Sequence, residues 1–191
     1  ESAGGGLCAA LCIKARDTGA VNVAFQMPLY PMLDDRETET PRDNHGKVWN
    51  TRRNRFAWCC YLRGQKRGDL SPYAAPARLT DFSDLPPAYT FVGNGEPFYA
   101  ETVQYVENLK KSGIPASMDV YCSDMHAFDM MQPDTPLSRE ADRRFNEQFA
   151  YGTTLIHLIE KRFLLNWIYT HSRQREIFMP FHTLMKNFNG C

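Results

Sequence analysis

The chain has 191 residues, of which 43% are hydrophobic, and this is enough for one domain with a sizeable core. Its 22 Lys and Arg residues balance 22 Asp and Glu residues, so overall charge favours neither nucleic acid nor an anionic membrane as a partner. The six cysteines include no CxxC pair of the zinc-binding kind, and we interpret them as reduced, buried residues of a cytoplasmic protein.

Helical periodicity begins close to the N-terminus. Leu7, Leu11 and Ala15 recur at helical spacing, and Gly19 stands where a C-capping glycine belongs, so a helix is expected over residues 3–19. The same pattern predicts further helices over residues 49–62, 79–85, 98–112 and 138–150.

The expected helix 49–62 has two possible interpretations. Its aromatic residues alternate with arginines, a pattern that can bind nucleic acid. A simpler interpretation is a helix with one solvated basic face. Its inward residues are then Trp49, Phe56, Ala57, Cys60 and Tyr61.

Three apolar or alternating runs predict strands, over residues 21–30, 88–92 and 116–122. Strands and helices follow one another in turn, which is typical of a right-handed, parallel α/β sheet. Functional residues of such sheets lie at the carboxyl ends of the strands.

Three polar residues stand at such ends: Ser2, Glu96 and His126. A serine hydroxyl becomes nucleophilic when a neutral imidazole takes its proton, and the imidazole needs a carboxylate on its other nitrogen. Glu101 and Asp124 are alternatives to Glu96, although Glu101 lies one turn into a helix and should point away from the strand end.

The first seven residues resemble part of a nucleophile elbow, G-x-S-x-G, in which a serine is exposed at a sharp turn between a strand and a helix. Ser2 is then the nucleophile, and the backbone N–H of Ala3 is one donor of the oxyanion hole. Asp34, Asp35 and Arg36 are interpreted as a structural turn of buried ion pairs.

Six blocks of the sequence, in order, resemble the hormone-sensitive-lipase-like esterases, the fold-3 α/β-hydrolases. These blocks are Ser2-Ala3-Gly4-Gly5-Gly6-Leu7, Tyr30-Pro31-Met32-Leu33-Asp34-Asp35-Arg36, Ser71-Pro72-Tyr73-Ala74-Ala75-Pro76-Ala77-Arg78, Leu85-Pro86-Pro87-Ala88-Tyr89, Glu96-Pro97-Phe98 and His126-Ala127-Phe128-Asp129.

The resemblance implies hydrolysis of small to medium acyl esters through an acyl-enzyme. Ser2 would be the nucleophile, Glu96 the acid and His126 the base, with no cofactor and no metal. Glu96 stands where the family usually has Asp, and Ala127 where it usually has Gly.

The resemblance covers residues 1–150 and implies the C-terminal half of the hydrolase domain, a partial α/β-hydrolase fold of parallel strands with flanking helices. No His-Gly-Gly run, which in this family completes the oxyanion hole, occurs in the sequence. Two alternatives to an active esterase therefore stay open. One is an inactive remnant, and the other is a subunit or interaction fragment that pairs with a missing N-terminal half or with a second copy.

Residues 151–191 do not resemble the family and form an expected helical or poorly ordered tail. Helices are expected over residues 154–169 and 174–188, and Pro180 would break or kink the second. Glu160-Lys161-Arg162 interrupts the first, so no transmembrane segment is expected. The tail is interpreted as a non-native extension or, alternatively, as an amphipathic helix that binds a membrane surface or a partner.

Overall fold

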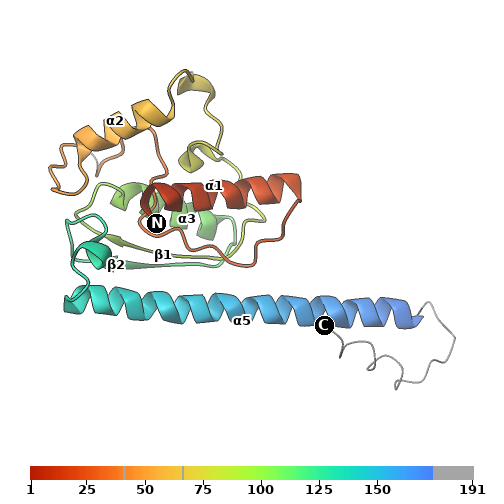
Figure 1. Ribbon diagram of the computed structural model, residues 1–191. Helices are drawn as coiled ribbons and strands as arrows, with labels where there is room; N and C mark the ends of the chain where they lie inside the picture. The colour runs from red at the N-terminus through yellow and green to blue at the C-terminus, as the bar shows by residue number, and fades with distance from the viewer. Residues whose placement is uncertain (41, 66, 174–191) are drawn as a thin grey trace, which may run out of the picture. The chain divides into compact units, whose positions relative to one another are not determined.

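The structure is a computed structural model that describes residues 1–40, 42–65 and 67–173 (Figure 1). It contains two compact units, Glu1–Gly152 and Thr153–Cys191. The helix expected over residues 174–188 lies outside the described residues. The assignment of residues 151–191 as a segment foreign to the family stays a prediction.

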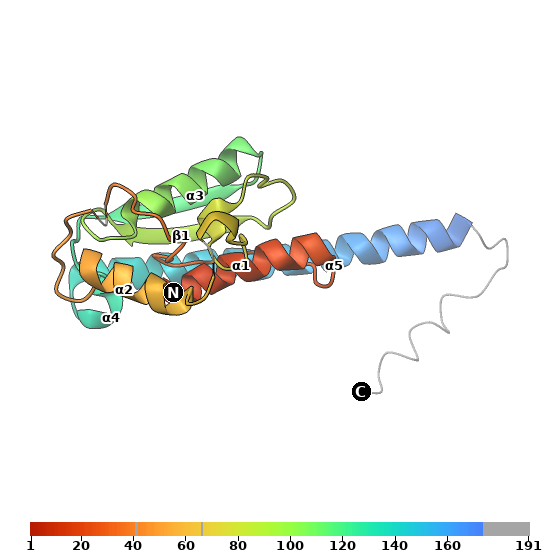
Figure 2. The same ribbon diagram turned by 90° about the horizontal axis from the view of Figure 1, so that it is seen from above.

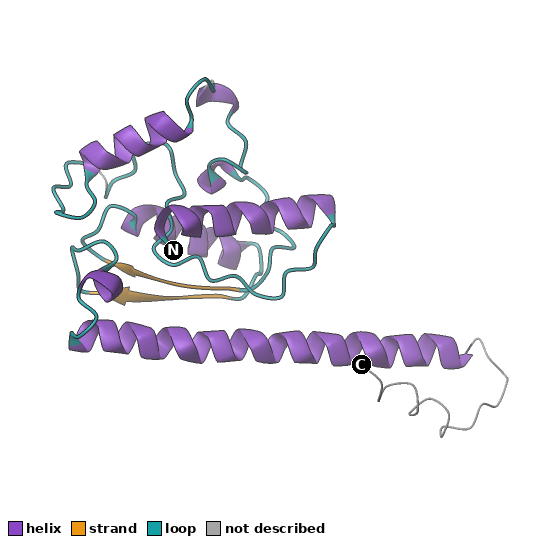
Figure 3. Cartoon of the chain, in the orientation of Figure 1, coloured by secondary structure: helices purple, strands orange, loops and turns teal. Residues whose placement is uncertain are grey.

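Two parallel strands form the sheet of the first unit. β1 (Ala88–Gly93) pairs with β2 (Ala116–Tyr121), in a register that runs from Ala88 opposite Ala116 to Gly93 opposite Tyr121. These are two of the predicted strands, and α3 (Tyr99–Lys111) connects them. Figure 3 shows this pair of strands with helices on both sides.

Helices cover both faces of this sheet. On one face, Tyr89 and Phe91 of β1 share a core cluster with Ala141 of α5 (Pro136–Arg173). On the other face, Ala88 shares a cluster with Ile13 of α1 (Ser2–Thr18) and with α3. Figure 2 gives the view of these layers from above. The packing confirms an α/β architecture.

The strand predicted over residues 21–30 is wrong as a regular element. Its segment runs beside β1 but forms a single parallel bridge, between Gln26 and Ala88. Pro28 has no N–H to donate, so the ladder cannot continue through it. Its carbonyl accepts a hydrogen bond from the Thr90 hydroxyl instead, at 2.6 Å.

The expected helix 49–62 exists as α2 (Thr51–Tyr61), but its predicted inward face is only partly correct, since Trp49 and Ala57 pack against a core cluster and the other three predicted residues do not. Phe56, Cys60 and Tyr61 are exposed, while Asn54 and Trp58 are buried. The Asn54 side chain can lie inward because its oxygen accepts a hydrogen bond from the Trp49 indole at 3.3 Å. The arginines of α2 are exposed, as the interpretation of a solvated basic face requires.

The helix predicted over residues 79–85 is also wrong. Only a short 3-10 turn, η2 (Pro76–Arg78), precedes this segment. The Asp81 carboxylate accepts a hydrogen bond from the Ser83 N–H at 2.9 Å, a local bond that competes with a helix. In addition, the ring of Pro86 disfavours helical backbone geometry at the preceding residue, Leu85.

The helices predicted over residues 138–150 and 154–169 form one continuous helix, α5. The change in composition at Tyr151 does not end it. Among the described residues, no helix combines the length and the apolar character that crossing a bilayer requires.

The cysteines differ from the predicted burial. Of the five described, Cys12 is buried and Cys8 half-buried, while Cys59, Cys60 and Cys122 are exposed. All five are free thiols. The location of the protein in the cytoplasm stays a prediction.

Candidate active site

Ser2 stands at a strained turn where α1 begins. Its φ is 53°, in the left-handed region that non-glycine residues rarely occupy. Backbone hydrogen bonds hold it on both sides: its N–H donates to the Leu29 carbonyl, and its carbonyl accepts from the Met32 N–H, both at 3.0 Å. The chain therefore fixes the hydroxyl of the half-buried Ser2 at a sharp bend, as a nucleophile elbow requires.

Glycines next to Ser2 let the helix approach this segment closely. A Cβ on Gly6 would lie 2.1 Å from the Met32 carbonyl oxygen, and one on Gly5 would lie 2.9 Å from that of Leu29. Gly4 has open space around it. The two later glycines are thus required by packing, and Gly4 is not.

Glu96 lies just beyond the carboxyl end of β1 and is fully buried. Its Oε1 accepts a hydrogen bond from the Gly93 N–H at 3.1 Å, and its Oε2 bonds to Nδ1 of His126. Burial raises the pKa of Glu96, and the bond to His126 opposes this shift. The carboxylate is thus held by two partners in a site without solvent.

His126 follows the carboxyl end of β2 and is 5% exposed. Its Nε2 lies 2.9 Å from the Ser2 hydroxyl oxygen. A carboxylate on Nδ1 favours the tautomer with hydrogen on that nitrogen, which leaves Nε2 free to accept the Ser2 proton. The structure therefore brings Ser2, His126 and Glu96 together in one chain of hydrogen bonds.

Three aromatic rings surround the His126 imidazole. The ring centroids of Phe98, Tyr30 and Trp49 lie 5.0, 5.3 and 6.2 Å from that of the imidazole. The Tyr30 hydroxyl donates to Asp129 at 3.2 Å, and this bond anchors the ring. Such a cage fixes the imidazole plane and excludes water from it.

The alternatives to Glu96 lie elsewhere. Glu101 accepts hydrogen bonds from the Leu33 and Asp34 N–H groups, away from His126. Asp124 is exposed and borders a separate hollow. Neither is placed to orient the imidazole.

The expected ion pairs of residues 34–36 are present, with one partner from outside the turn. Asp34 pairs with Arg36 at 2.8 Å, and Asp35 pairs with Arg78 at 2.6 Å. Both aspartates are buried. Their role is to hold the loop that follows Met32.

Ala3 stands in the first turn of α1. The N–H groups of a first helical turn have no intrahelical acceptor, and the positive end of the helix dipole lies there. The Ala3 N–H is thus available to a negatively charged oxygen next to Ser2.

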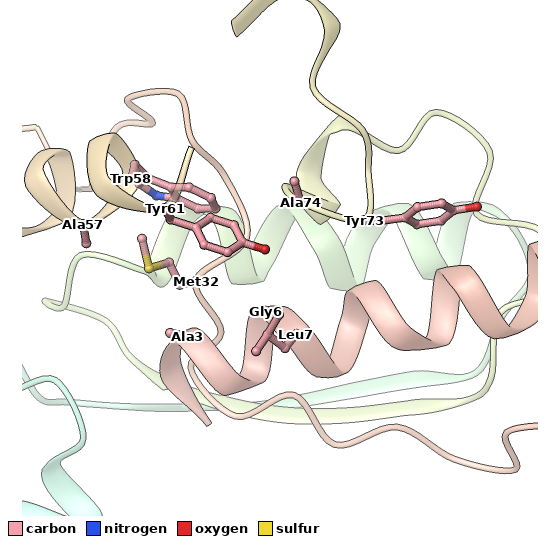
Figure 4. A pocket seen from close by; sticks show the side chains of 9 residues that line it. All are labelled: Ala3, Gly6, Leu7, Met32, Ala57, Trp58, Tyr61, Tyr73 and Ala74. Atoms are coloured by element: carbon pink, nitrogen blue, oxygen red, sulfur yellow. The ribbon is translucent and has the colours of Figure 1, made fainter. Parts of the chain in front are cut away.

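An apolar pocket of about 210 Å³ begins at Ala3 and lies between α1 and α2. Figure 4 shows its side chains, which come from α1, α2 and the loops that follow Tyr30 and Pro72. They are Ala3, Gly6, Leu7, Met32, Ala57, Trp58, Tyr61, Tyr73 and Ala74.

Sequence reasoning did not identify the roles of Tyr30, Asp129 and Glu101. Tyr30 and Asp129 fall inside the blocks that carry the resemblance, which was the available signal. For Glu101, the sequence indicated only an alternative to Glu96 as the acid. Among the described residues, no cluster of three or more His, Cys, Asp or Glu side chains is arranged to hold a metal ion.

Comparison with known proteins gives a consistent result. The sequence model of the alpha/beta hydrolase fold family matches residues 1–130. Esterase LipI of Mycobacterium tuberculosis (strain ATCC 25618 / H37Rv) is 27% identical over 146 residues, which cover 75% of this chain and 46% of LipI.

Many solved structures are similar, and two of them serve as examples. One is a bacterial heroin esterase, with 32% identity and a TM-score of 0.69, over 75% of this chain and 47% of that one. The other is esterase LipW from Mycobacterium marinum, with 29% identity and a TM-score of 0.71, over 81% of this chain and 46% of that one. The chain spans less than half the length of each of these three relatives.

Proposed function

Because the chain belongs to the α/β-hydrolase fold family, we propose that it is a serine carboxylic ester hydrolase that works through an acyl-enzyme. The observation that carries this proposal is the hydrogen-bonded order Ser2, His126, Glu96, with 2.9 Å between the hydroxyl oxygen and the imidazole. The esterase names of the relatives support the same reaction class.

In the first half-reaction, the Ser2 oxygen attacks the ester carbonyl carbon and its proton passes to Nε2 of His126. Glu96 stabilises the imidazolium ion through Nδ1. The tetrahedral oxyanion accepts a hydrogen bond from the Ala3 N–H. The intermediate then expels the alcohol, which takes the proton from His126, and Ser2 keeps the acyl group.

In the second half-reaction, water replaces the alcohol. His126 takes a proton from the water as it attacks the acyl carbon, and returns that proton to Ser2 when the carboxylic acid leaves. The reaction needs neither a metal nor a cofactor at any step. The pocket beside Ala3 supports esters with a small or medium apolar group, since its volume is about 210 Å³ and its lining is apolar.

A second candidate is a catalytically idle member of the family that needs a complementary polypeptide or a second copy. The observation that favours it is that the described residues offer Ala3 as a single identified oxyanion donor. Loss of one donor from an oxyanion hole typically costs about 10²–10³ in rate.

The experiment is hydrolysis of p-nitrophenyl acetate and butyrate by the full chain, beside a Ser2→Ala variant. We expect turnover that disappears in the variant, and labelling of Ser2 by a fluorophosphonate. Equal rates in both proteins, together with no labelling of folded protein, would refute the esterase proposal and favour the second candidate.

A further inference from the structure

Glu101 is a carboxyl group that the proposed reaction does not use. It lies in the first turn of α3 and is 2% exposed. Its Oε1 accepts hydrogen bonds from the N–H of Leu33 at 2.6 Å and of Asp34 at 3.3 Å. Its Oε2 has no hydrogen-bond partner within the described part of the chain. A buried carboxyl group is costly, so its presence calls for a role.

The two segments that Glu101 joins lie at opposite ends of the hydrogen-bond chain from Ser2 through His126 to Glu96. Leu33 follows Met32, whose N–H donates to the carbonyl of Ser2 at 3.0 Å. Glu101 itself stands in the helix that begins shortly after Glu96. The bonds from Glu101 therefore connect the backbone support of the nucleophile to that of the acid.

Thr40 ties the same two segments together a second time. Its hydroxyl donates to the Pro97 carbonyl at 2.9 Å and accepts from the Ala100 N–H at 3.0 Å. Thr40 thus holds the start of α3 against the loop that follows Asp34. Two independent side-chain links at one junction indicate that its geometry is held closely.

We propose that Glu101 is a positioning residue, which sets the separation of Ser2 from the Glu96–His126 pair by clamping the Leu33–Asp34 backbone onto the first turn of α3. This inference rests on the esterase function proposed above. Glu101 acts through the backbone and touches no reacting atom. Its side chain serves as a hydrogen-bond acceptor held at a fixed distance from the backbone of α3.

The protonation state of Glu101 agrees with this role. Burial raises its pKa well above the ordinary value, which favours the neutral acid. Oε1 can accept both backbone bonds when the proton is on Oε2. Glutamine presents the same acceptor at the same reach, whereas leucine presents none.

The test compares Glu101→Gln and Glu101→Leu in the full chain, with Glu107→Leu as the matched control on the exposed side of α3. We expect the glutamine variant to keep kcat within about threefold. The leucine variant should lower kcat by about 10–100-fold, because a displacement near 1 Å can cost about that factor, and should change KM by less than about threefold. The control should match the wild type.

A second measurement does not depend on activity. The proton between Nδ1 of His126 and Glu96 gives a low-field NMR resonance, and amide exchange reports the Leu33 and Asp34 N–H bonds. We expect the leucine variant to shift this resonance and to lose protection at both amides, while the glutamine variant does neither. If the wild type has no esterase activity, the proposed function fails, and these two readouts still decide the role of Glu101.

Several results would overturn the proposal. One is a leucine variant with unchanged kcat and an unchanged His126 resonance, and another is a glutamine variant as impaired as the leucine variant. If the leucine variant lacks a native circular dichroism spectrum, Thr40→Val takes its place, because it breaks the same junction from the other side. That variant should lower kcat by about three- to tenfold, and full activity there would overturn the inference.

Discussion

The edge of the sheet that carries Glu96 and His126 differs from the outer face of α1 and α2. At the sheet edge, Glu96 is 0% and His126 is 5% exposed, and each has a hydrogen-bond partner. On the outer helical face, Leu11 is 65% and Phe56 is 70% exposed. The first region has a geometry fixed by directional bonds, while the side chains of the second project into solvent. Changes to the first should therefore alter chemistry, and changes to the second should be tolerated.

The largest effect is expected at the edge of the sheet that carries Glu96 and His126. Glu96→Gln keeps the size of the side chain but presents an amide to Nδ1 of His126, which destabilises the imidazolium and allows the wrong tautomer. We expect kcat for p-nitrophenyl butyrate to fall by about 10³–10⁴-fold, with KM nearly unchanged, measured by steady-state kinetics.

The control for this change is Glu39→Gln, since Glu39 is an exposed carboxylate. It should leave kcat unchanged. A Glu96→Gln variant with more than about a tenth of the wild-type kcat would show that the acid is not Glu96.

A smaller effect is expected where α1 meets the segment after Tyr30. Gly6→Ala places a methyl group 2.1 Å from the Met32 carbonyl oxygen, so the backbone must move. The unfolding free energy should fall by about 2–3 kcal/mol, measured by urea denaturation.

Gly4→Ala is the matched variant two residues earlier in α1, where a methyl group meets nothing within 4 Å. It should stabilise the chain by about 0.5–1 kcal/mol, since alanine favours a helix over glycine. Equal changes in the two variants would contradict the close approach of α1 to Met32.

The smallest effect is expected on the open helical face. Leu11→Lys replaces a side chain that is 65% exposed, so the unfolding free energy should change by less than about 0.5 kcal/mol. Thermal unfolding at several protein concentrations provides the measurement. A loss of 2 kcal/mol or more would mean that this face is packed in solution, and the contrast between the two regions would then be wrong.

The sequence was informative where a local rule decides the structure. Gly19 and Gly113 end their helices with φ values of 63° and 77°, as glycines at helix ends commonly do. Ser2, Glu96 and His126 were predicted to meet because polar residues at the carboxyl ends of neighbouring parallel strands share one edge. Their hydrogen-bonded arrangement agrees with that prediction, and their catalytic roles stay a proposal.

The sequence was uninformative where packing overrides a local pattern. Apolar periodicity placed Phe56 and Tyr61 of α2 inward, but the polar Asn54 takes the buried position because it has a partner in Trp49. Pro28 interrupts a run that otherwise reads as a strand. Contacts between distant segments, such as Glu101 with Leu33, have no signature in local spacing.

The ring cage around His126 has an optical consequence. Trp49 lies with its ring centroid 6.2 Å from the imidazole, and the emission of an indole depends on the polarity of its immediate surroundings. Trp49 fluorescence therefore reports on what lies beside His126. In a variant whose other two tryptophans are replaced by phenylalanine, that emission follows the binding of a molecule next to the imidazole, with no turnover needed.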